Sequence, residues 1–67
     1  MTVLVNEKPR DLPDTSDLAY LLSEIGIEGQ KGVAVALNGT IVPTANWSAT
    51  PLSSNDQVLV VQATQGG

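Results

Sequence analysis

The sequence predicts a single α+β domain, residues 1–67, in which a mixed β-sheet carries one helix across one face. Three observations support this: several short runs rich in Val, Leu and Ile, one segment with apolar residues at helical spacing, and an Asn-Gly pair between two strand-like runs. The expected order is β-β-α-β-β-β. Two strands, a helix and then more strands are typical of folds that keep the helix on one side of the sheet.

The first two strands are expected at the start of the chain. Thr2–Asn6 is short, apolar and rich in β-branched residues, and Asn6–Pro9 suits a turn. The second strand is expected over Arg10–Pro13. Because proline cannot donate a ladder hydrogen bond, this strand should lie at an edge of the sheet or end at Pro13.

A helix is expected over Asp17–Ile25. Four apolar residues recur at positions i, i+3, i+4 and i+7, namely Leu18, Leu21, Leu22 and Ile25. The cluster Asp14-Thr15-Ser16-Asp17 offers side-chain oxygens for the free amides of the first turn. Gly26 follows where a left-handed residue often ends a helix.

The second half of the chain should contain three strands. Val33–Leu37 reads as a strand, Asn38-Gly39 as a tight hairpin turn, and Thr40–Val42 as the return strand. The last strand is expected over Asp56–Ala63, pairing with the first strand at the centre of the sheet. The intervening residues 44–55 look irregular, with three apolar side chains expected to plug the core from this segment: Trp47, Pro51 and Leu52.

Strand alternation predicts an apolar surface on the face of the sheet that the helix does not cover. One helix covers one face, and alternate side chains of a strand point to opposite faces. The uncovered set should be Leu4, Ala34, Ala36, Leu59 and Val61. Such patches often mark partner surfaces. Two alternatives stay open: the 44–55 segment could cover this face, or scattered exposed apolar residues could have no function.

Composition excludes several classes of function. The chain has no Cys and no His, so disulfides, thiolate metal sites and histidine catalysis are excluded. Its net charge is −4 with three basic residues, which argues against nucleic-acid binding. Capping and solvation explain the acidic residues, so no metal site is expected. Without a membrane span or a signal peptide, we expect a cytoplasmic protein that is not an enzyme.

The sequence ends in Gly66-Gly67, shortly after the last predicted strand. Only Thr64-Gln65 separates that strand from the glycines. Residues 64–67 are therefore expected to form a thin, flexible tail that can thread into a narrow active site on a partner. One interpretation is that the Gly67 carboxylate is the reacting group of the protein. The plain alternative is a frayed terminus.

These features together resemble the ubiquitin-like β-grasp sulfur carriers, and most closely the ThiS-type carriers of thiamine biosynthesis. The most specific part is Ala36-Leu37-Asn38-Gly39-Thr40-Ile41-Val42-Pro43 followed by Trp47, then Leu52, Asp56, Val58–Gln62 and Gly66-Gly67. The resemblance covers the whole chain, and it implies the β-grasp fold.

The resemblance also implies a mechanism and partners. A ThiF-type adenylyltransferase would use ATP and magnesium to convert the Gly67 carboxylate into an acyl-adenylate. Persulfide sulfur from a cysteine desulfurase relay would displace AMP and leave a thiocarboxylate, whose sulfur a ThiG-type thiazole synthase would accept. The chain itself would bind no cofactor.

Two other functions stay open. The chain could carry sulfur for another pathway, such as molybdopterin synthesis. It could also be a ubiquitin-like modifier, which would form isopeptide bonds, or a plain binding module, which would not depend on its last residue.

Overall fold

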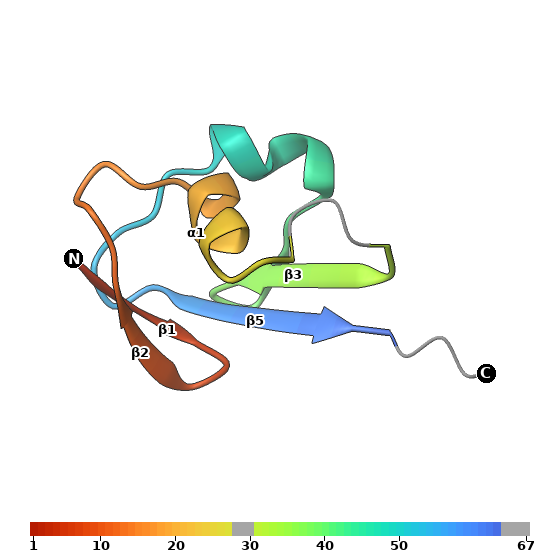
Figure 1. The fold of residues 1–67 in the computed structure, drawn as a ribbon, viewed down its shortest axis with the longest axis horizontal. Coiled ribbons are helices and arrows are strands. Elements are labelled where there is room, and N and C mark those ends of the chain that lie inside the picture. Colours follow the sequence, from red (N-terminus) through yellow and green to blue (C-terminus); the bar gives the residue numbers. More distant parts are fainter. Residues whose placement is uncertain (28–30, 64–67) are drawn as a thin grey trace.

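A computed structural model describes residues 1–27 and 31–63 of the chain. The elements in order are β1 (Thr2–Val5), β2 (Lys8–Asp11), α1 (Leu18–Glu24), β3 (Val33–Leu37), β4 (Thr40–Ile41), the 3₁₀ helix η1 (Thr44–Ala49) and β5 (Gln57–Gln62). The strands form one sheet in the order β2-β1-β5-β3-β4, with α1 across one face (Figure 1). The predicted α+β fold is confirmed.

Strand β5 occupies the centre of the sheet. It pairs in parallel with β1, where Val5 lies opposite Val58, and antiparallel with β3, where Val35 lies opposite Val60. The hairpin partners β2 and β4 form the two edges. The predicted pairing of the first and last strands is therefore confirmed, and the sheet is mixed as expected.

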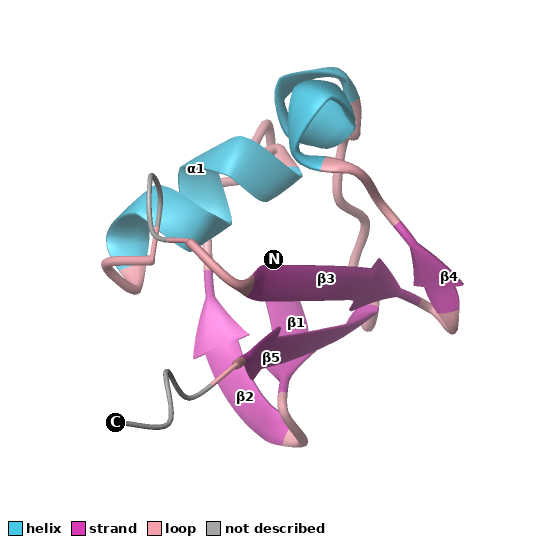
Figure 2. Ribbon diagram, turned by 90° about the vertical axis from the view of Figure 1, so that its right-hand side faces the viewer, coloured by secondary structure: helices cyan, strands magenta, loops and turns pink. Residues whose placement is uncertain are grey.

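The hydrophobic core lies between the sheet and a second layer made by α1 and η1 (Figure 2). Its buried members are Val3, Leu12, Leu18, Leu21, Leu22, Val35, Trp47, Leu52 and Val58. The indole of Trp47 donates a hydrogen bond to the carbonyl of Val42 at 2.9 Å. This bond satisfies the one polar atom of a side chain that is only 5% exposed.

Helix α1 begins and ends as its sequence predicts. Asp17 is the N-cap, and its Oδ1 accepts a hydrogen bond from the backbone N–H of Tyr20 at 2.8 Å. Gly26 adopts φ +81° just beyond the C-cap, Ile25. Leu18, Leu21 and Leu22 are fully buried, as their spacing requires.

Loss of the N-cap will weaken the domain measurably. We expect Asp17→Ala to lower the free energy of unfolding by about 1 kcal/mol, because the first turn loses a side-chain acceptor for its free amides. Urea denaturation followed by circular dichroism measures the change. Asp14→Ala is the matched control, since Asp14 pairs with the Met1 amino group rather than with an amide of α1, and its side chain is 91% exposed. Equal losses in both variants would contradict the capping role.

The second strand differs from its predicted position. It spans Lys8–Asp11 rather than Arg10–Pro13, because Asn6 and Glu7 both adopt left-handed backbone angles (φ 50° and 71°) and reverse the chain in two residues. The predicted edge position is confirmed.

The connection from β4 to β5 is more regular than expected. Residues 44–49 form the 3₁₀ helix η1, which is anchored by the buried Trp47. The apolar residues of this segment do not recur at helical spacing, so the sequence did not indicate a helix. Leu52 is buried as predicted, but the expected burial of Pro51 is wrong. Pro51 is exposed and forms an isolated bridge with Asp17 at the start of α1, so it lies beside the core rather than in it.

Candidate functional site

The face of the sheet turned away from α1, here called the outer face, brings the predicted apolar residues together. Ala34 lies opposite Val61 and Ala36 lies opposite Leu59 in the β3–β5 pairing. Leu4 lies opposite Gln57 in the β1–β5 pairing. Because residues directly opposite each other share a face and side chains alternate along β5, all five predicted residues lie on the outer face.

These residues differ in how much surface they present. Leu59 and Val61 are 54% and 53% exposed. Ala36, by contrast, is only 8% exposed, since its methyl group lies between the larger side chains of its cross-strand neighbours Leu59 and Ile41. Leu59 and Val61 are therefore the main contact groups of the outer face, and Ala36 forms part of its floor.

One outer-face residue was missed by the sequence analysis. Ile41 is 65% exposed and lies opposite Ala36 in the β3–β4 pairing. The signal was present in the sequence, because a two-residue Asn38-Gly39 turn fixes the hairpin register. Counting back from that turn places Ile41 beside Ala36, which extends the apolar surface to the β4 edge.

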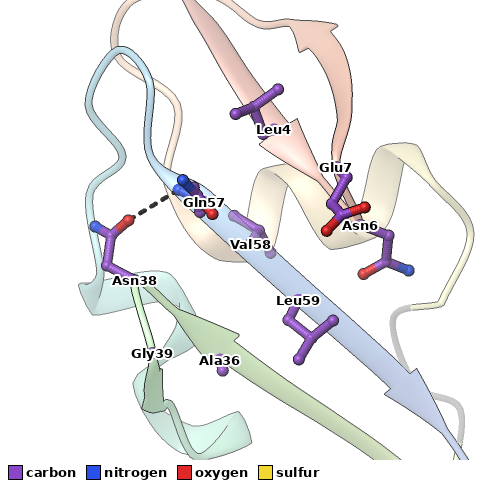
Figure 3. Close-up of a pocket in the computed structure, with 9 residues that line it drawn as sticks. All are labelled: Leu4, Asn6, Glu7, Ala36, Asn38, Gly39, Gln57, Val58 and Leu59. Atoms are coloured by element: carbon purple, nitrogen blue, oxygen red, sulfur yellow. Dashed lines mark hydrogen bonds between the residues drawn. The ribbon is translucent and has the colours of Figure 1, made fainter.

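A shallow hollow of about 520 Å³ lies on the outer face near the start of β5 (Figure 3). Leu4, Ala36 and Leu59 supply apolar lining, and both hairpin turns reach its rim. The lining residues are Leu4, Asn6, Glu7, Ala36, Asn38, Gly39, Gln57, Val58 and Leu59. Glu7 is the only charged residue among them. A face with an apolar floor and a polar rim is suited to docking another protein.

The segment that could have covered this face lies on the other side of the sheet. Residues 44–49 form η1, which packs against α1, and its Trp47 belongs to the core between helix and sheet. The alternative in which residues 44–55 shield the outer face is therefore wrong for the part of the chain that the structure describes.

The predicted tail residues, Thr64, Gln65, Gly66 and Gly67, lie outside the described residues. Ala63, the described residue that precedes them, donates its backbone N–H to the carbonyl of Gly32 at 2.7 Å. Strand β5 thus runs from the hollow at one end of the outer face toward the segment that carries Gly67.

Within residues 1–27 and 31–63, no three Asp, Glu, His or Cys side chains gather as metal ligands. No helix among them is long and apolar enough to span a membrane. The charge of Glu24 raises the pKa of Tyr20, whose hydroxyl donates to that carboxylate at 3.2 Å. This pair lies on α1, across the sheet from the outer face.

Comparison with known proteins points to one family. The model of the ThiS family matches residues 3–67. The sulfur carrier protein ThiS of Escherichia coli K12 is 30% identical over 67 residues, and the match covers both chains completely. A crystal structure of a thiamine biosynthesis protein (ThiS) from Geobacter metallireducens superimposes with a TM-score of 0.82 at 28% identity over the full length of both chains. A solution structure of a thiamine biosynthesis protein from Geobacter metallireducens gives a TM-score of 0.80 at 29% identity, covering this chain fully and 88% of the other.

Proposed function

The chain belongs to the ThiS family of sulfur carriers in thiamine biosynthesis, and we propose that Gly67 is the residue on which it carries sulfur. The observation that supports this proposal is that the family match extends through Gly67, four residues beyond Ala63, where the described part of the chain ends. Those four residues can extend by at most about 14 Å, at roughly 3.5 Å per residue. The Gly67 carboxylate can therefore enter a partner's active site while the folded domain stays on that partner's surface.

The chemistry begins with activation, because a carboxylate is a poor electrophile. A ThiF-type adenylyltransferase, using ATP and magnesium, joins the Gly67 carboxylate to the α-phosphate and releases pyrophosphate. The terminal sulfur of a persulfide, supplied by a cysteine desulfurase relay, then attacks the acyl carbon and displaces AMP. A relay thiol reduces the resulting acyl disulfide, is itself oxidised to a disulfide, and leaves the thiocarboxylate.

The outer face is the proposed docking surface for these partners. Leu59, Val61 and Ile41 are each more than half exposed, whereas the opposite face of the sheet is covered by α1 and η1. A ThiG-type thiazole synthase, which takes the sulfur, would use the same face and the same tail. Sharing one face makes the partners bind in succession rather than together.

In this proposal the chain is a substrate of its partners: one enzyme modifies it at Gly67, and another takes the sulfur from it. Its glycines suit this role, because a Cβ at Gly66 or Gly67 would obstruct a narrow channel and restrict the backbone angles available to the tail. ATP and magnesium would belong to the activating partner. The cytoplasmic location expected from the sequence stays a prediction.

The decisive experiment is the intact mass of the purified chain after incubation with ATP, a persulfide donor and a ThiF-type adenylyltransferase from the same organism. We expect one sulfur-for-oxygen exchange, mapped by fragmentation to the peptide that ends at Gly67. Omission of ATP is the control and should leave the mass unchanged. Isopeptide conjugates on lysines of other proteins, with no exchange at Gly67, would favour the modifier function instead.

A further inference from the structure

Two asparagines bind the backbone of strand β5 where a neighbouring strand has ended, Asn6 at Val60 and Asn38 at Gln57. Strand β1 ends at Val5, but β5 continues to Gln62 on the side where β1 has turned away. The backbone of Val60 faces this vacated side. Its N–H and C=O groups need partners there, since an unpaired backbone group in a sheet is unfavourable.

Asn6 supplies those partners. The backbone N–H of Asn6 donates to the Val58 carbonyl at 2.9 Å, which completes the β1–β5 ladder. Its side chain continues the ladder: Oδ1 accepts from the Val60 N–H at 2.8 Å, and Nδ2 donates to the Val60 carbonyl at 3.2 Å. A carboxamide carries the same acceptor and donor as a peptide group, so Asn6 stands in for the next residue of a parallel strand.

A second asparagine holds the other end of β5 from the opposite side. Asn38 donates its N–H to the Gln57 carbonyl at 2.8 Å and accepts the Gln57 N–H on Oδ1 at 2.9 Å, the bond drawn in Figure 3. Both asparagines have a left-handed backbone, with φ 50° at Asn6 and 49° at Asn38. The two asparagines differ in their bonds, because the Asn6 side chain makes both bonds to Val60, whereas the Asn38 side chain makes only one of the two bonds to Gln57. Of the two, Asn6 is the one near the end of β5 that leads to Gly67.

We propose that Asn6 is a positioning residue for the sulfur-carrying terminus, an inference that rests on the proposed function. With Asn6 in place, the chain is hydrogen-bonded on the β1 side at Val60 and on the β3 side at Ala63. Four residues follow Ala63 in the sequence, up to and including Gly67. Without the carboxamide, Val60 loses both of its partners on the β1 side, and only the β3 side then orders the end of β5 from which the carboxylate enters an active site.

The expected signature separates positioning from docking. Asn6 also lines the hollow, so loss of a docking contact there would raise the KM for the chain in adenylation, whereas loss of positioning alone leaves the KM within about twofold of wild type. The kcat should fall by about tenfold, because displacement of a reacting group by about 1 Å costs on the order of 10²-fold in rate.

Asn6→Gly is the test variant, since glycine adopts a positive φ readily and the turn is kept. Asp17→Ala is the control for overall stability, because it removes a side-chain hydrogen bond to the backbone at the start of α1, across the sheet from the outer face. Asn6→Asp is the second variant. It tolerates the left-handed backbone and keeps the acceptor for the Val60 N–H, but it cannot donate to the Val60 carbonyl. The measurements are adenylation kinetics with the ThiF-type enzyme and ATP, together with amide hydrogen exchange at Val60.

We expect Asn6→Gly to lower kcat and to speed exchange at Val60, with Asn6→Asp intermediate and Asp17→Ala unchanged in kcat. An unchanged kcat in Asn6→Gly would overturn the inference while leaving the carrier function intact. An equal fall of kcat in Asp17→Ala would also overturn it, because Asn6 would then act only through overall stability. If the wild-type chain is not adenylated at all, the proposed function fails first.

Discussion

Removal of Gly67 will abolish adenylation of the chain and leave the fold unchanged. The truncated chain still ends in a glycine carboxylate, Gly66, but that carboxylate lies one residue closer to Ala63. One residue corresponds to about 3.5 Å of reach, whereas a reaction needs its groups placed to within about 1 Å. Pyrophosphate release with the ThiF-type enzyme and ATP should fall to background.

A variant that restores the length of the tail makes this test sharper. Insertion of one glycine between Ala63 and Thr64, combined with removal of Gly67, returns the terminal carboxylate to its original distance from the sheet. We expect this chain to regain part of the activity, and the circular dichroism spectra of all three chains to coincide, since no core residue changes. Adenylation of the truncated chain at the wild-type rate would show that Gly67 does not carry the reacting carboxylate.

A negative charge at Val61 will weaken docking to the activating enzyme. Val61 is 53% exposed on the outer face, beside Ala34 and close to the end of β5. In a docked complex, an aspartate there would be buried against apolar surface without a partner, which is strongly unfavourable. We expect Val61→Asp to raise the dissociation constant by about 30-fold, corresponding to the loss of about 2 kcal/mol typical of a central interface residue.

The domain itself should tolerate this substitution. Because Val61 is exposed, the change in the free energy of unfolding should stay within about 1 kcal/mol, the range of strand propensity. Thr44→Asp is the matched control, since it adds the same charge at an exposed position on η1, in the layer across the sheet. Calorimetric titration of both variants tests the prediction. Equal affinity for Val61→Asp and Thr44→Asp would remove the outer face from the docking model.

The sequence predicted most of the fold because its local signals agree with the tertiary structure. The leucines at helical spacing define α1, and Asn38-Gly39 forms the expected hairpin turn with both residues left-handed. The displaced second strand has a different cause. Glutamate carries no preference for a left-handed backbone, so nothing in the sequence indicated that Glu7 would complete a two-residue turn and start β2 at Lys8.

The candidate site was predictable only in part. Alternation along the strands placed Leu59 and Val61 on one face correctly, because alternation is a property of the strand itself. The shielding of Ala36 and the exposure of Ile41 depend on cross-strand register, which the strand pattern alone did not supply. The role of Asn6 depends on a contact between residues 54 positions apart, and a single sequence contains no signal for such a contact.

The placement of Trp47 has a practical consequence for studying the carrier. It is the only tryptophan in the chain, it is buried between α1 and the sheet, and it lies across the sheet from the outer face. Its fluorescence should therefore report unfolding and stay constant while a partner docks. A shift of its emission on mixing would show that binding rearranges the core, so the protein contains its own optical probe for separating recognition from loss of structure.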